Sequence, residues 1–264
     1  MHVALPCSAL LLALAGAPDP DALARDVLAL SASGDPVRLD RAAAAVPEAL
    51  RGDPAYRGAV AGRVLARFLA AADLRETSAA SPDGAPGLRR ARAAQEGALE
   101  ELRPLVLQAP DDPDVLRVLA VYYGLDGRPE EVRRLSARVR AGSAAVDPWL
   151  DFAELAAGVR GRTPGEAEPL LSSFVAAHPE ILPPRMSLVR ARLALGDRDG
   201  AVAALDDLLG VDPDHEAAKE AKAALLAPPP VERLMPIAPS TVPAPTAPGY
   251  LPRKKARALS RSPG

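Results

Sequence analysis

The chain has 264 residues, 48% of them hydrophobic and 25% charged, with a formal net charge of −2. This length allows one large or two small domains, and the composition is ordinary for a soluble protein with a hydrophobic core. The small net charge gives no support to nucleic-acid binding by the chain as a whole. Aromatic residues make up 3% of the chain, and the scarcity of aromatic and β-branched residues favours helices over strands.

Residues 1–17 have the features of a signal peptide. The apolar run from Ala9 to Ala15 is too short to span a bilayer, and Ala13-Leu14-Ala15 fits an A-x-A cleavage site. We therefore expect export to a bacterial periplasm or cell envelope. Because Met1-His2-Val3 contains no Lys or Arg, a cytoplasmic protein with an apolar N-terminus is the alternative. Cys7 is the only cysteine, so a chain cleaved after Ala15 would have no disulfide.

Residues 18–110 are expected to form helical hairpins that carry no recognisable repeat signature. Apolar side chains at helical spacing predict four helices, at residues 21–30, 37–50, 55–74 and 88–108. Residues 77–87 are rich in Ser, Pro, Asp and Gly and predict a loop. Pro104 predicts a kink or a break in the fourth helix, because proline cannot donate the backbone hydrogen bond of a helix interior.

A regular spacing of glycine and proline then sets the fold. Three glycines recur at intervals of 34 and 35 residues: Gly127, Gly161 and Gly196. Four prolines recur at intervals of 35, 31 and 34 residues: Pro113, Pro148, Pro179 and Pro213. Each glycine should end a first helix in the left-handed conformation, and the Asp before three of the prolines should cap the next helix. This period predicts an all-α fold, an α-solenoid of stacked antiparallel helical hairpins, with a generic helical bundle as the alternative.

Residues 111–226 resemble the tetratricopeptide repeat (TPR) family. The pattern is clearest at residues 195–213, where a Gly-Asp turn precedes small and apolar residues at helical steps and a closing Asp-Pro. Arg185 and Arg192 stand where the family usually has aromatic residues. The resemblance implies that ten residues pack the repeats together: Ala120, Tyr123, Gly127, Ala167, Phe174, Gly196, Ala201, Leu205, Leu208 and Pro213. Residues 215–226 are expected to be a capping helix with a polar outer face.

The TPR resemblance also implies a function. In that family the first helices of the repeats line a concave groove that binds an extended peptide or a helix of a partner protein. The corresponding residues of this chain are Arg117, Val121, Asp151, Glu154, Met186 and Arg190. We therefore expect a protein–protein interaction scaffold with a protein partner and no small-molecule cofactor.

Residues 227–264 differ in composition from the rest of the chain. They include ten prolines, which predicts a disordered tail that builds no core. The end of the tail is basic, with Arg253, Lys254, Lys255, Arg257 and Arg261. Three interpretations stay open: a structural tether that holds an anionic surface, a segment that folds back on the acidic body, and a tail with no packed role.

The sequence shows no catalytic motif. It has no P-loop, no G-x-S-x-G and no dinucleotide-binding glycine cluster. His178 and His215 lie beside the closing prolines of two repeats and are expected at surface turns, without a second ligand that would make a metal site. We therefore expect a non-enzymatic protein, with a helical accessory domain of an envelope enzyme as the alternative.

Overall fold

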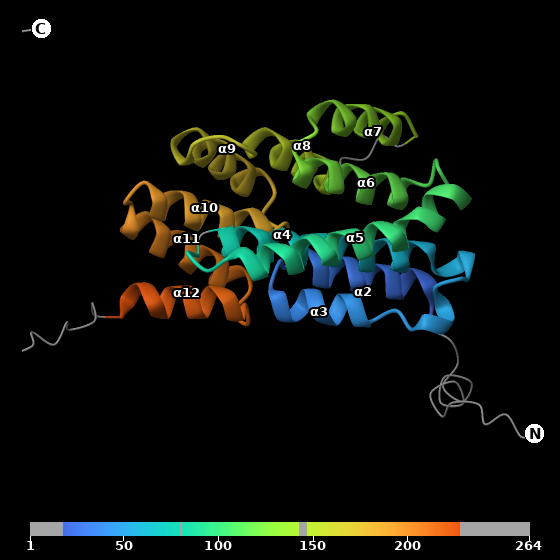
Figure 1. The fold of residues 1–264 in the computed structure, drawn as a ribbon, viewed down its shortest axis with the longest axis horizontal. Coiled ribbons are helices and arrows are strands. Elements are labelled where there is room, and N and C mark those ends of the chain that lie inside the picture. Colours follow the sequence, from blue (N-terminus) through green and yellow to red (C-terminus); the bar gives the residue numbers. More distant parts are fainter. Residues whose placement is uncertain (1–17, 80, 143–146, 228–264) are drawn as a thin grey trace, which may run out of the picture. The chain divides into compact units, whose positions relative to one another are not determined.

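The computed structural model describes residues 18–79, 81–142 and 147–227. All regular secondary structure in these ranges is helical, which confirms the predicted all-α fold (Figure 1). The predicted signal peptide and the basic tail lie outside the described residues. The α-helices are α2 (Pro20–Ala32), α3 (Pro36–Ala44), α4 (Arg57–Ala79), α5 (Ala85–Gln108), α6 (Pro113–Asp126), α7 (Pro129–Gly142), α8 (Pro148–Val159), α9 (Pro164–Ala177), α10 (Pro183–Ala194), α11 (Arg198–Val211) and α12 (Glu216–Leu226). Two short 3₁₀ helices, η1 (Glu48–Leu50) and η2 (Pro54–Tyr56), connect α3 to α4.

Aspartate followed by proline begins several of the helices. Asp112 and Asp147 cap α6 and α8, and their carboxylates accept backbone N–H groups of the first turn, as predicted. Asp19 and Asp35 cap α2 and α3 in the same way. The third predicted pair is different: Asp212 ends α11, and α12 begins at Glu216 with His215 as its N-cap.

The three periodic glycines adopt the conformation that their spacing predicts. The backbone φ angles of Gly127, Gly161 and Gly196 are 76°, 76° and 79°, in the left-handed region that costs glycine little. Each glycine lies between the two helices of a hairpin, and α6–α7, α8–α9 and α10–α11 are these hairpins. Gly34 has a similar φ of 66° and lies between α2 and α3.

Two predicted boundaries in the N-terminal part were wrong. Helix α4 continues to Ala79 and α5 begins at Ala85, so both ends of the expected loop at 77–87 are helical, while residues 81–84 form the predicted turn. Helix α3 ends at Ala44, and the rest of the expected helix to residue 50 contains η1. Helix α5 continues through Pro104, so of the predicted kink or break the break does not occur. Tertiary packing explains the long helices, because α4 and α5 pack against each other along their length.

Helix α4 is the centre of the molecule. Twelve of its residues are buried, more than one face of a helix provides, because α4 packs against α2, α3, α5 and α6. The main core cluster runs from Val27 to Ile181, so the N-terminal hairpins and the first repeats share one core across residue 110. A second core cluster, from Ala167 to Ala218, joins α9, α10, α11 and α12.

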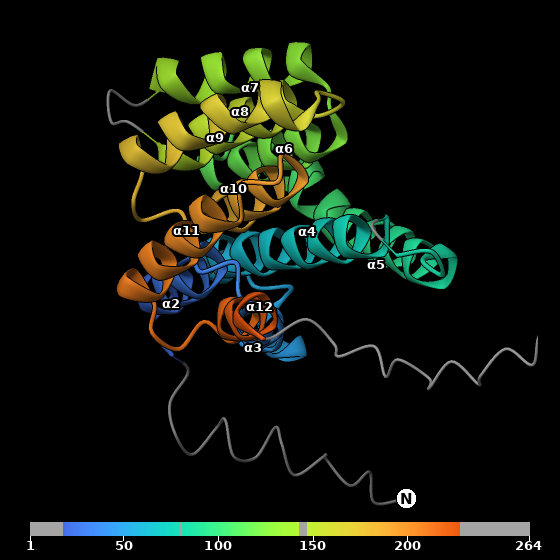
Figure 2. The ribbon, with the colours of Figure 1, turned by 90° about the vertical axis from the view of Figure 1, so that its left-hand side faces the viewer.

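The stack of hairpins returns to its own beginning. Packing contacts lead from α4 through α6, α8, α9, α10 and α11 to α12, and α12 then contacts α3. Figures 1 and 2 both show α12 beside α3. The backbone N–H of Leu182 donates to the carbonyl of Ala32 at 2.9 Å, which joins the start of α10 to the end of α2. The helix expected to cap an open solenoid therefore packs against the first hairpin.

Candidate functional site

Two of the six expected groove residues are unavailable to a partner. Val121 is fully buried in the main core, because α6 packs against α4, α7 and α8 and leaves no exposed apolar face. Arg117 is mostly buried and is bound within the protein: its Nε lies 2.7 Å from Asp147, and it also pairs with Asp114. The pair with Asp147 holds α6 against the start of α8, and the pair with Asp114 lies within α6. The prediction that Val121 and Arg117 are exposed was wrong.

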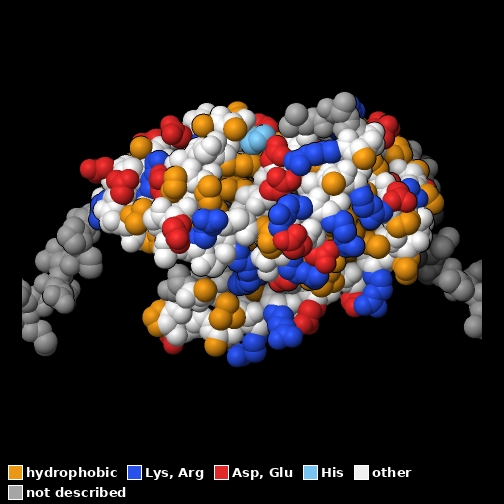
Figure 3. All heavy atoms as spheres, turned by 90° about the horizontal axis from the view of Figure 1, so that it is seen from above, with side chains coloured by type: hydrophobic (Ala, Val, Ile, Leu, Met, Phe, Trp, Pro, Cys, Tyr) orange, Lys and Arg blue, Asp and Glu red, His pale blue; other side chains and the backbone are white. Residues whose placement is uncertain are grey.

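Asp151 and Glu154 lie on the face that carries α7, α8 and α9. Arg140 of α7 donates to both carboxylates, at 2.8 Å to Asp151 and 3.0 Å to Glu154. His178 lies 3.3 Å from Asp151, and its ring stacks on Phe174 at 4.6 Å, so it is mostly buried rather than a free surface side chain. Figure 3 shows acidic and basic side chains interleaved on this face. These residues tie α7, α8 and α9 together and do not line a cleft.

Met186 and Arg190 line a cleft of about 200 Å³ between α4, α8 and α10. Its apolar wall consists of Leu69, Ala72, Leu125, Phe152, Leu155, Val159, Leu171 and Met186. Gly34 and Leu39 from the first hairpin, and Pro183 and Pro184 from α10, complete it. The cleft therefore exists because the last repeats close on the first hairpin.

Arg190 closes one side of the cleft. Its guanidinium donates to the carboxylates of both Asp73 and Glu76 on α4. These contacts join α10 to α4 across more than a hundred residues of sequence. One guanidinium faces two carboxylates, so the three side chains together carry one net negative charge.

Arg75 and Arg160 form a second charged feature of the cleft, which we call the arginine pair. Both guanidiniums donate to the carbonyl oxygen of Leu125 at the end of α6, the Arg75 Nη2 at 2.9 Å. Burial lowers the pKa of Arg75, and the positive charge of Arg160 lowers it further. The stem of Arg160 packs over Gly127, where a Cβ atom would lie 2.6 Å from the Arg160 Cδ.

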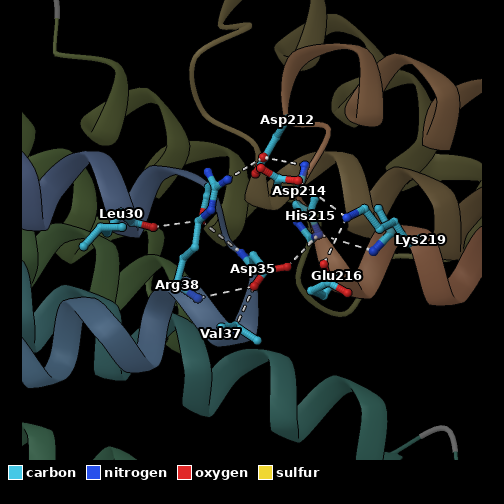
Figure 4. A network of polar contacts seen from close by, with 11 residues as sticks. Leu30, Asp35, Val37, Arg38, Asp212, Asp214, His215, Glu216 and Lys219 are labelled. Carbon is cyan, nitrogen blue, oxygen red and sulfur yellow. Dashed lines mark hydrogen bonds and ion pairs between the residues drawn. The ribbon is translucent and has the colours of Figure 1, made fainter.

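A polar network joins the first hairpin to α11 and α12 (Figure 4). The Arg38 Nη2 lies 2.7 Å from Asp212, whose side chain is 5% exposed. One carboxylate oxygen of Asp35 caps α3, and the other lies 3.2 Å from the Nδ1 of His215. The same Nδ1 accepts the N–H of Ala218 at 3.3 Å, so His215 caps α12. His215 is fully buried, and the expectation of a surface turn was wrong because the first hairpin covers this turn.

The packing residues expected from the TPR resemblance lie largely in the two cores. Ala120, Ala201, Leu205 and Leu208 are fully buried, Ala167 and Phe174 are nearly so, and Tyr123 is partly buried. Gly196 and Pro213 are exposed at their turns, so the prediction that they pack the repeats was wrong. No local pattern in the sequence indicates the tertiary contacts of Arg75, Arg160, Asp35 or Arg38. Each is one of many charged residues in the chain, and its role depends on neighbours that are distant in sequence.

No group of three His, Cys, Asp or Glu side chains in residues 18–79, 81–142 and 147–227 could hold a metal ion. None of the helices in the same ranges is long and apolar enough to cross a membrane.

Residues 161–225 match a family model described as tetratricopeptide repeat. No curated protein and no solved structure matches the sequence. The matched segment runs from the end of α8 through α12 and contains most of the second core cluster. It also includes residues 195–213, where the repeat pattern is clearest. Residues 161–225 are therefore similar to the tetratricopeptide repeat family, and the helices of the described residues are consistent with a TPR-like helical repeat.

Proposed function

We propose that this protein is a non-enzymatic protein–protein interaction scaffold that binds a peptide or helix of a partner in the cleft between α4, α8 and α10. The observation that carries the proposal is an apolar cleft with a charged rim in a TPR-like protein. Clefts that bind partner segments combine apolar walls with a few polar groups that fix orientation.

The composition of the cleft supports a protein segment as its occupant. Phe152, Leu155, Val159 and Met186 are contributed by α8 and α10 and provide apolar surface for one or two side chains. Arg190, Asp73 and Glu76 together carry one net negative charge at one side, while the arginine pair carries two positive charges at another. A partner segment with both apolar and polar side chains matches this arrangement, since apolar anchors in pockets supply most of the binding energy at such interfaces.

Site-directed photo-cross-linking tests the proposal. A photoreactive amino acid is placed at Ser187, which lines the cleft, in cells that naturally produce the protein. We expect an adduct with a partner protein that disappears when Met186→Glu is added, because a carboxylate in the apolar wall repels an apolar anchor. Leu193→Glu, on the same helix but outside the cleft and 38% exposed, is the matched control and should leave the adduct in place. Adducts that are the same in both variants would show that the cleft is not the binding site.

We also propose that the protein is exported, on the strength of the apolar run and the A-x-A sequence in residues 1–17. Cell fractionation and N-terminal sequencing of the native protein test this. The expected result is an envelope protein that begins at Gly16, and an intact N-terminus in the cytoplasmic fraction would refute it.

A further inference from the structure

Arg75 and Arg160 are held side by side although both carry positive charge. They come from different parts of the fold, Arg75 from α4 and Arg160 from the turn that follows α8. The carbonyl oxygen of Leu125 accepts a hydrogen bond from each of them. Gly127 leaves room for the stem of Arg160, since a Cβ atom there would overlap its Cδ. The position of the pair is thus fixed by the backbone at the end of α6.

The arginine pair keeps most of its hydrogen-bonding capacity. A guanidinium has five N–H donors, and the Leu125 carbonyl engages one from each. Among the described residues neither Arg75 nor Arg160 forms an ion pair with a carboxylate. Glu76 and Asp126 act on Arg75 from a greater distance, and Glu76 is paired with Arg190. Two adjacent cations with unused donors form a site for an anion.

The arginine pair is also part of the apolar cleft. Arg75 and Arg160 line it together with Leu155, Val159 and Leu125. A carboxylate bound there would have an apolar wall next to it, where water screens the charges less than at an open surface. The ligand that fits has an acidic group and a bulky apolar group close together.

We propose that the arginine pair binds an Asp or Glu carboxylate of the partner, next to an apolar side chain that fills the cleft. The inference rests on the proposed function and specifies the chemistry of the partner: an acidic–apolar peptide segment. The planar guanidinium matches the geometry of a carboxylate, and the anion offsets the repulsion between Arg75 and Arg160.

Selection of peptides from a random dodecapeptide library on the full chain tests this inference. We expect the selected peptides to carry Asp or Glu within two positions of Leu, Ile, Met or Phe. Arg75→Gln or Arg160→Gln should each weaken the best peptide about tenfold, the effect of losing a hydrogen bond to a charged group, as measured by fluorescence anisotropy. The double variant Arg89→Gln/Arg90→Gln makes the same change of charge at two exposed residues of α5 and should leave the affinity unchanged.

A change in the peptide completes the experiment. Replacing the acidic residue of the peptide by the corresponding amide should weaken its binding to the native protein about as much as a single arginine substitution does. The same replacement should hardly change the affinity of the peptide for the Arg75→Gln/Arg160→Gln variant, because the contact is already lost there. If Arg75→Gln alone lowers the melting temperature, Arg160→Gln carries the test, because the Arg160 side chain is exposed.

Different results would refute the role of the arginine pair and the role of the cleft as the binding site. Peptides that lose binding with Met186→Glu but have no acidic preference would overturn the inference and leave the cleft as the binding site. Equal losses in the Arg89→Gln/Arg90→Gln control would overturn it too, because the effect would then be one of net charge. Peptides that bind equally to the Met186→Glu protein would refute the proposed function itself.

Discussion

Replacing Gly34 by alanine tests whether the last repeats close on the first hairpin. Gly34 has a left-handed φ of 66°, and a Cβ atom at this position would lie 2.9 Å from the Pro183 Cγ and 3.0 Å from the Pro183 Cα. Gly196 has a similar φ of 79°, but a Cβ atom there would have no heavy atom within 4 Å. The two substitutions therefore share the backbone penalty and differ in the contact with α10.

The expected free-energy changes follow from this difference. A left-handed conformation costs a residue with a Cβ atom about 1–2 kcal/mol, so Gly196→Ala should lower the free energy of unfolding by about that amount. Gly34→Ala adds an overlap with the backbone and ring of Pro183, and overpacking of this kind costs about 1–3 kcal/mol more. We expect a total loss of about 2–5 kcal/mol for Gly34→Ala, on these two scales.

Urea denaturation followed by circular dichroism measures both changes. Hydrogen exchange adds a local measurement, since the N–H of Leu182 donates to the Ala32 carbonyl at 2.9 Å across the same contact. This N–H should exchange faster in Gly34→Ala and remain protected in Gly196→Ala. Equal destabilisation by the two substitutions, with unchanged exchange at Leu182, would refute the closed arrangement of α10 against the first hairpin.

Three further predictions concern single contacts. Arg38→Ala removes the partner of the nearly buried Asp212 carboxylate and should lower the free energy of unfolding by about 1–3 kcal/mol, measured by urea denaturation; an unchanged midpoint would contradict it. Hydrogen bonds from the backbone N–H and side chain of Thr163 lower the pKa of Glu166, so its contribution to stability should be complete above the ordinary pKa of 4.5 and be lost as the pH falls through the lowered value. An NMR titration should show this lowered pKa, and Thr163→Ala should raise it toward the ordinary value. Leu205→Ala leaves a cavity in the second core cluster and should cost about 2–5 kcal/mol in thermal or urea unfolding, unlike a change at an exposed leucine.

Local signals predicted the repeats well. Glycine at 127, 161 and 196 and Asp-Pro at 112–113 and 147–148 act on the backbone of their own turn, and each has the conformation that its sequence predicts. The predicted ends of helices were wrong where tertiary packing sets the length of the helix. The Ser- and Gly-rich stretch after Leu74 is largely helical because α4 and α5 pack against each other.

The candidate site could be predicted less well. Met186 and Arg190 were selected from the TPR resemblance and line the cleft, whereas Val121 belongs to the core. The resemblance assumes an open stack in which first helices face a groove. Here α4 packs against α6, so the face of α6 that would line the groove of an open stack belongs partly to the core.

By itself the sequence determined the helical class, the hairpin period and the turns, because these depend on neighbouring residues and on the conformational limits of glycine and proline. Tertiary structure alone decided that the stack closes. Arg38 meets Asp212 across 174 residues, and His215 is buried against Asp35. It also decided the cleft and its arginine pair, since both are assembled from helices that are far apart in the chain. Contacts of this kind depend on how the helices pack, which no local pattern in the sequence specifies.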